Sequence, residues 1–118
     1  KMLGGGMRQA GVLAAAGLIS LEKMTGRLGQ DHVRAKNLFE GLKQVQGLNL
    51  DARSASNMIY FDLVDRIKLT ENQIIEEMKK YGVLVDWAGP RRFRLVTHYW
   101  VDDAGVEKAI KGFSEILK

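Results

Sequence analysis

The spacing of apolar side chains predicts four helices, of which two occupy the first 46 residues. Residues 7–24 are mostly alanine, leucine, isoleucine and valine, a composition typical of a helix that is buried on most sides. Gly26 and Gly29 interrupt this pattern, and a second, more amphipathic helix is expected from there to about Gln46. Its predicted inward face contains Val33 or Ala35, followed by Leu38, Phe39, Leu42 and Val45.

The third helix has the clearest start and end signals. Thr70 with Gln73 three residues later predicts a capping box, and Gly82 is expected to end the helix. Gly47 likewise stands where a left-handed C-cap is expected after the second helix. Asp102 is the expected N-cap of the fourth helix. The inward positions are Ile74, Ile75, Met78 and Tyr81 in the third helix, and Val106, Ile110, Phe113 and Leu117 in the fourth.

Alternating side chains predict the strands. Leu48–Leu50 is short, Met58–Leu63 is expected to be covered on both faces, and residues 83–85 and 93–97 form a later pair joined by a loop over 86–92. The predicted fold is therefore α/β, with a mostly antiparallel sheet of about three to four strands, helices packed on one face, and a buried helix before them.

Composition limits the setting of the protein. A chain of 118 residues can enclose one modest hydrophobic core. The absence of cysteine excludes disulfides and thiolate metal sites. It also allows a cytoplasmic location, which we expect. Two histidines 66 positions apart are not a recognisable metal-ligand set. The most apolar stretch, 11–21, is shorter than the roughly 20 residues that span a bilayer, so no membrane contact is expected.

The net charge of +4 suits an anionic ligand. Eighteen basic residues are scattered among fourteen acidic ones, and the dense cluster is Arg91, Arg92 and Arg94. This distribution indicates a local site and not a nucleic-acid-binding stripe. The nearby Trp87, Tyr99 and Trp100 would suit base stacking, but such aromatic residues more often pack in cores or interfaces.

Arg94 lies in an apolar strand, on one face with Val96 and His98. A guanidinium there needs a partner, which is either an internal carboxylate or a ligand, and structural pairing is the commoner outcome. A lone histidine at a strand end is more often structural than catalytic, so His98 is interpreted as structural, as is His32 in the second helix.

The glycine run in residues 3–8 precedes the first helix, where backbone N–H groups can approach an anion. Its spacing matches neither a P-loop nor a dinucleotide-binding fingerprint. On spacing alone, an ordinary turn between domains is the favoured interpretation.

A longer pattern carries more weight. Residues 1–11 read KMLGGGMRQAG, and 14–17 read AAAG. Asp31 with His32, Asn57 with Met58, residues 82–84 (GVL) and residues 94–98 (RLVTH) then follow in order. Across nearly its whole length, the chain resembles the low-specificity threonine aldolases.

This resemblance implies the small C-terminal domain of a fold-type I enzyme that carries pyridoxal 5′-phosphate on a lysine of a preceding large domain. Residues 1–24 would connect to that domain and residues 25–118 would form the small one. The enzyme would cleave threonine, allo-threonine and related β-hydroxy-α-amino acids to glycine and an aldehyde, as a homotetramer or homodimer. Arg94 would bind the substrate carboxylate, and Lys1 and Arg8 would lie near the cofactor.

The same resemblance implies that the cofactor-binding lysine lies before Lys1, so this chain contains no catalytic residue and is inactive alone. Tyr99, Trp100, Asp86 and Trp87 depart from the family pattern, which leaves the substrate preference open. Two alternatives remain: part of a related pyridoxal-phosphate-dependent β-eliminating lyase, or a freestanding basic nucleic-acid-binding module.

Overall fold

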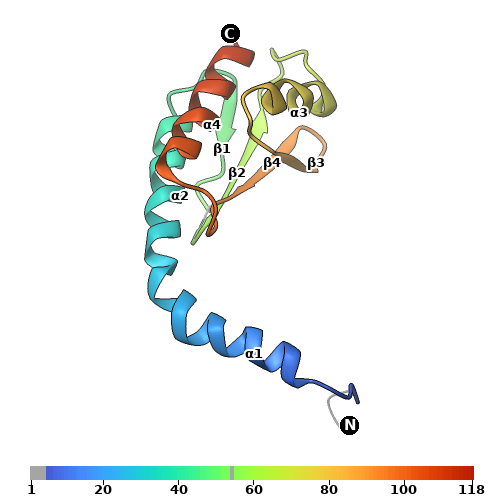
Figure 1. The fold of residues 1–118 in the computed structure, drawn as a ribbon. Coiled ribbons are helices and arrows are strands. Elements are labelled where there is room, and N and C mark those ends of the chain that lie inside the picture. Colours follow the sequence, from blue (N-terminus) through green and yellow to red (C-terminus); the bar gives the residue numbers. More distant parts are fainter. Residues whose placement is uncertain (1–4, 54) are drawn as a thin grey trace.

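A computed structural model describes residues 5–53 and 55–118 (Figure 1). Its helices are α1 (Gly11–Ile19), α2 (Leu28–Leu42), α3 (Glu71–Lys80) and α4 (Asp103–Ile116), and its strands are β1 (Leu48–Leu50), β2 (Met58–Leu63), β3 (Asp86–Gly89) and β4 (Arg92–Val96). A π-helical turn (Ser20–Met24) and a 3₁₀ turn (Thr25–Arg27) join α1 to α2.

The four strands form one sheet in the order β1-β2-β4-β3, and every neighbouring pair is antiparallel. The α2, α3 and α4 helices contribute to a core on one face, where α2 and α4 lie side by side (Figure 1). Phe61 of β2 stacks on Phe93 of β4 with centroids 5.5 Å apart and meets Phe113 of α4 edge to face at 5.2 Å. The predicted fold class is confirmed.

The other face of the sheet stays open in this chain. Ile59, Phe61 and Leu63 of β2 are buried, whereas Met58 is exposed and Tyr60 is partly exposed. The prediction that both faces of this strand are covered is therefore wrong for this chain, because all three packed helices lie on the same side.

The helix expected over 7–24 forms from Gly11 onward, but no other described part of the chain buries it. α1 projects away from the sheet and carries no buried residue (Figure 1). Any cover for its apolar side chains must therefore come from outside the described residues. Gly26 and Gly29 do not interrupt the helical path, because Gly26 lies in the 3₁₀ turn before α2 and Gly29 lies in α2 itself.

The third strand differs most from expectation. The chain pairs with β4 over Asp86–Gly89, which was predicted as a loop, and not over 83–85. Gly89 has φ +154° and Arg91 has φ +58°, so the chain reverses tightly between them. Pro90 and Gly89 thus mark a hairpin turn and not a long loop. Val83 and Val85 pack against the core from an irregular segment.

The helix-end predictions at Thr70, Gly82 and Asp102 are confirmed. The Thr70 hydroxyl accepts from the Gln73 N–H, the Gln73 side chain accepts from the Thr70 N–H, and the Asp102 carboxylate accepts from the N–H of Gly105. Gly82 ends α3 with φ +72°. On α2 the inward residue is Ala35, since Val33 is exposed.

Gly47 has the expected positive φ of +103°, but it does not cap α2, which ends at Leu42. It lies instead in the turn before β1. A Cβ added there would come within 2.9 Å of Ile67.

Candidate functional site

The three arginines of the basic cluster have three different environments. The Arg91 guanidinium donates from Nη2 to the carbonyl oxygens of Val64 and Ile67 at 2.8 and 3.0 Å. The Arg91 N–H donates to the Glu71 carboxylate at 2.6 Å. Arg91 therefore holds together the two turns that precede α3 and β4, which is a structural role.

Arg92 is bound by two carboxylates. Its guanidinium lies 2.6 Å from Asp51 Oδ2 and 2.8 Å from Asp62 Oδ2, and it stands over the ring of Tyr60 at 5.3 Å. The hydrogen bond from the Arg53 side chain, with further bonds from the Arg53 N–H and from Arg92, holds the pKa of Asp51 well below its usual range. The Asp51 hydrogen bond in turn raises the pKa of Arg92. The charge of Arg92 is thus compensated by two carboxylates within the chain.

Arg94 is different, because within residues 5–53 and 55–118 it has no hydrogen bond or ion pair. It is exposed on the open face of the sheet, opposite Tyr60 of β2 and Asp86 of β3 in the strand register. The alternation predicted for this strand is correct, with Phe93, Leu95 and Thr97 buried. The guanidinium of Arg94 is thus free to take an anion from outside the chain.

A groove of about 570 Å³ lies beside Arg94. It runs between the 82–86 segment, the end of β4 and the beginning of α4. Both Arg94 and His98 line it, together with the exposed indole of Trp100. The structure therefore gathers two of the singled-out polar residues at one hollow.

His98 is engaged locally. Its Nδ1 accepts a hydrogen bond from the Trp100 N–H at 3.3 Å, and its ring meets the Trp100 indole edge to face at 6.0 Å. These contacts agree with the structural interpretation of His98.

Residues 5–8, the described part of the glycine run, precede α1, which projects away from the sheet (Figure 1). Arg8 is exposed there, whereas Arg94 belongs to β4. Lys1 falls outside the described residues. Within the described residues α1 separates Arg8 from Arg94, so the expected roles of Arg8 near the cofactor and of Arg94 at the substrate stay predictions.

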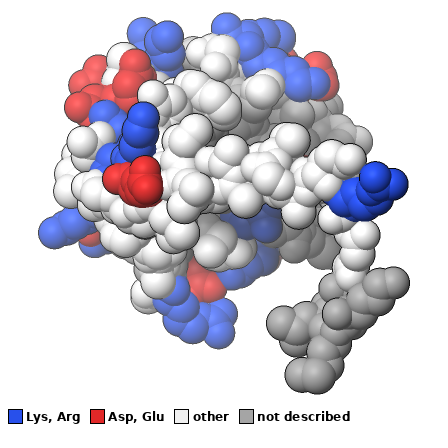
Figure 2. Space-filling model, turned by 60° about the horizontal axis from the view of Figure 1, so that its bottom comes forward, with Lys and Arg blue, Asp and Glu red and all other residues white. Residues whose placement is uncertain are grey.

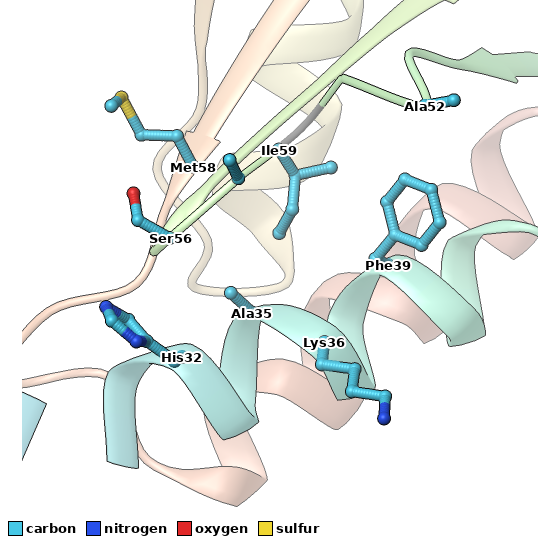
Figure 3. Close-up of a pocket in the computed structure, with 9 residues that line it drawn as sticks. His32, Ala35, Lys36, Phe39, Ala52, Ser56, Met58 and Ile59 are labelled. Carbon is cyan, nitrogen blue, oxygen red and sulfur yellow. The ribbon is translucent and has the colours of Figure 1, made fainter. Parts of the chain in front are cut away.

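A smaller pocket of about 200 Å³ lies between α2 and the chain before β2 (Figure 3). Phe39 and Ile59 reach into it, whereas the amino end of Lys36 points away. His32 borders this pocket, but the Ser56 hydroxyl bonds to the Asn57 side chain at 3.3 Å and not to His32. No histidine-activated serine is formed here, which agrees with the structural interpretation of His32.

Figure 2 shows Lys and Arg interspersed with Asp and Glu around the face in view. Such mixing does not form the continuous basic stripe that a nucleic-acid groove requires. No group of three His, Asp or Glu in the described part of the chain could hold a metal ion. None of the helices described is long and apolar enough to cross a membrane.

One cluster escaped sequence reasoning. Arg27, Asp31, Asn57 and Thr97 join the start of α2 to the end of β4 through buried and half-buried hydrogen bonds. The four-residue spacing of Arg27 and Asp31 on one helix was the signal that could have identified one pair. The bonds to Thr97 depend on the fold and have no local signal.

The model of the family described as beta-eliminating lyase matches residues 1–65, which is more than half of the chain. Low-specificity L-threonine aldolase 1 of Arabidopsis thaliana is 35% identical over 118 residues, covering 99% of this chain and 33% of that protein. The low specificity L-threonine aldolase of Escherichia coli K12 is 39% identical over 98 residues, covering 83% and 27%. The chain thus spans about a third of the length of these relatives or less.

Solved structures share the fold at lower identity. The cystine C-S lyase C-DES superposes with a TM-score of 0.70 at 22% identity, covering 90% of this chain and 28% of that one. The family match over residues 1–65 and the two aldolase relatives identify the family of the chain by sequence, and the solved structure agrees in fold. It is a member of the beta-eliminating lyase family and is similar in sequence to low-specificity threonine aldolases across nearly its whole length.

Proposed function

We propose that this chain is the C-terminal part of a pyridoxal-phosphate-dependent aldolase that cleaves threonine, allo-threonine and related β-hydroxy-α-amino acids to glycine and an aldehyde. The observation that carries the proposal is the free guanidinium of Arg94 beside a groove. An arginine is well suited to a carboxylate, because its planar fork makes two parallel hydrogen bonds. Arg94 would bind and orient the α-carboxylate of the amino acid.

The residues at the start of α1 fit the phosphate end of the cofactor. Arg8 is exposed, the first turn of α1 contains no acidic residue, and the N-cap residue Ala10 makes no side-chain cap. Positive partial charge at a helix N-terminus favours a phosphate. Arg8 and Lys1 would neutralise its charge. When bound, pyridoxal phosphate supplies the electron sink that lets a bond to the α-carbon break.

Two parts of the chain have separate roles in this proposal. Residues 1–24 connect to a preceding large domain, and residues 25–118 form the small domain that carries Arg94. The separation is supported by burial, because α1 contributes nothing to the core, whose members begin at Ala35. The apolar side chains of α1 would be covered by the large domain or by a second subunit, in a homodimer or homotetramer. The absence of cysteine is compatible with a cytoplasmic location, which we also propose.

A second candidate is a pyridoxal-phosphate-dependent lyase that performs β-elimination. The description of the matching family and the shared fold with a cystine C-S lyase favour it. Both candidates require a carboxylate-binding arginine, so Arg94 alone does not separate them.

The products separate these two activities. The longer protein, purified with pyridoxal phosphate and incubated with L-threonine and L-allo-threonine, is expected to release glycine and acetaldehyde in equal amounts. Release of ammonia and a keto acid instead would contradict the aldolase and support the lyase. A serine control is informative, because elimination from serine gives pyruvate.

A further inference from the structure

The end of β4 is fixed by Thr97, the residue directly after the strand. The Thr97 N–H donates to the Asn57 carbonyl at 2.9 Å, and the Thr97 carbonyl accepts from Asn57 Nδ2 at 2.7 Å. The Thr97 hydroxyl donates to the carbonyl of Asp31 at 2.7 Å. With only 1% of its surface exposed, Thr97 has no access to water that would replace these bonds.

Asp31 belongs to the first turn of α2 and is itself buried, at 3% exposed. Arg27, one turn earlier, donates to both of its carboxylate oxygens at 2.6 and 3.0 Å. The Arg27 guanidinium also lies over the ring of Tyr99 at 4.9 Å. We call Arg27, Asp31, Asn57 and Thr97 the latch, since they tie the start of α2 to the residues just before β2 and just after β4, at one end of the β2–β4 ladder.

Thr97, the latch residue at the end of β4, lies three residues beyond Arg94. β3 pairs with β4 no further than Arg94, opposite Asp86, so beyond that point β2 and the latch hold the strand. The start of α2 is helically continuous, through the Ser20–Met24 and Thr25–Arg27 turns, with α1. The latch therefore connects the strand that carries Arg94 to the helix that leads to the glycine run.

We propose that Thr97 and Asp31 are positioning residues for Arg94: they set the direction of β4 relative to the α1–α2 linker, and thereby the reach of the Arg94 guanidinium to an amino-acid carboxylate. The proposal rests on the carboxylate-binding role proposed for Arg94. Neither residue touches the carboxylate itself.

The test uses the full-length protein loaded with pyridoxal phosphate and measures the dissociation constant of glycine by calorimetry. Thr97→Val removes the hydroxyl and keeps the shape, and we expect it to weaken glycine binding ~5-fold, the factor worth about one net hydrogen bond. Thr97→Ser keeps the hydroxyl and should restore most of the affinity. Asp31→Asn, which loses the ion pair with Arg27, should weaken binding in the same direction.

Two controls separate positioning from general destabilisation. Thr70→Ala removes the N-cap of α3, which lies near the beginning of β4 and not near Thr97 at its end, and should leave glycine affinity unchanged although it lowers stability. In an Arg94→Ala background, Thr97→Val should add little further loss, because residues that act through one group are not additive.

Unchanged glycine affinity in both Thr97→Val and Asp31→Asn, each folded, would overturn the inference. An equal loss of glycine affinity in Thr97→Val and Thr70→Ala would overturn it as well. If Thr97→Val does not fold, Asp31→Asn and the Thr97→Ser comparison decide. Failure of the aldolase proposal looks different: threonine would yield no glycine, while glycine binding would still depend on Thr97.

Discussion

Three guanidinium groups within four residues differ in whether they have partners and in which, and this difference decides what each arginine can do. Arg91 is bonded to carbonyl oxygens, Arg92 to the carboxylates of Asp51 and Asp62, and Arg94 to nothing in the part of the chain that the structure describes. A guanidinium already held by two carboxylates gains little from a third anion. The proposed role in binding a ligand therefore falls to Arg94.

The Asp51 carboxylate gives a prediction at this scale. Hydrogen bonds from Arg53 and Arg92 lower its pKa in the folded protein. An Asp whose pKa is lower in the folded than in the unfolded protein stabilises the fold at pH values above the unfolded pKa of about 4. This stabilisation is lost as the pH falls from there toward the folded pKa. Asp51→Asn should therefore unfold at a lower urea concentration than the parent at pH 7. The difference between the two urea midpoints should become smaller as the pH falls below about 4.

Urea unfolding midpoints at pH 7 and pH 3 test this expectation. Asp65→Asn is a matched control, because Asp65 is exposed and has no ion pair among the described residues. A gap at Asp51 that is equal at both pH values would show that the carboxylate charge does not contribute.

The sequence could show that the arginine cluster needs partners but not which arginine has them. Asp62 and Asp51 are 30 and 41 positions from Arg92, and only the register of β2 against β4 and the course of the chain before it bring them together. The sequence equally could not show that Arg94 faces outward from the sheet, because both faces of β2 are rich in apolar or aromatic residues. That is why the sequence favoured an internal partner for Arg94, whereas the structure leaves its guanidinium without one among the described residues.

At the scale of elements, helix α4 packs closely on α3 through a glycine. A Cβ added at Gly112 would lie 2.9 Å from Met78 Sδ and 3.3 Å from Tyr81, and Met78 is fully buried. Gly112→Ala should destabilise the protein by about 1–3 kcal/mol, the usual cost of overpacking.

Gly17→Ala is the matched control for Gly112→Ala. Gly17 lies inside α1 with open space around its Cα, so alanine there should be neutral or add up to about 1 kcal/mol of helix stability. Thermal unfolding of both variants measures the difference. An equal loss at the two positions would contradict the packing of α3 on α4.

Elements with local signals were predicted well, and those without were not. The capping box at Thr70 and the cap at Asp102 involve residues three apart, so the sequence contains all of their chemistry. β3 was misplaced because Gly89 and Pro90 suit either a loop or a tight hairpin, and pairing with β4 decides between them. The open face of β2 depends on where helices pack, which periodicity does not reveal.

At the scale of the whole molecule, α1 is an apolar helix without a cover. Val12, Leu13, Leu18, Ile19 and Leu21 are 53 to 74% exposed. Contiguous apolar surface of this kind marks an interface. The composition of residues 7–24 correctly indicated a helix, but the predicted burial of that helix is not provided by the described residues.

This surface gives a prediction for the longer protein. Leu13→Lys should lower its thermal stability and shift its assembly state, because an unpaired charge at a buried interface is costly. Val33→Lys is the comparison, since Val33 is similarly exposed, at 59%, but lies on α2. Size-exclusion chromatography and thermal unfolding detect both effects, and equal behaviour of the two variants would argue against an interface on α1.

The central claim, that Arg94 binds the substrate carboxylate of an aldolase, is tested most directly by steady-state kinetics of the full-length protein with threonine. Arg66→Ala is the matched control, because Arg66 is exposed and its hydrogen bond among the described residues is a long one, 3.5 Å to Gln46. Arg94→Ala removes a charge-assisted interaction of about 1.5–3 kcal/mol, so KM should rise on the order of 10- to 150-fold while cofactor affinity holds. An unchanged KM in Arg94→Ala would contradict the account.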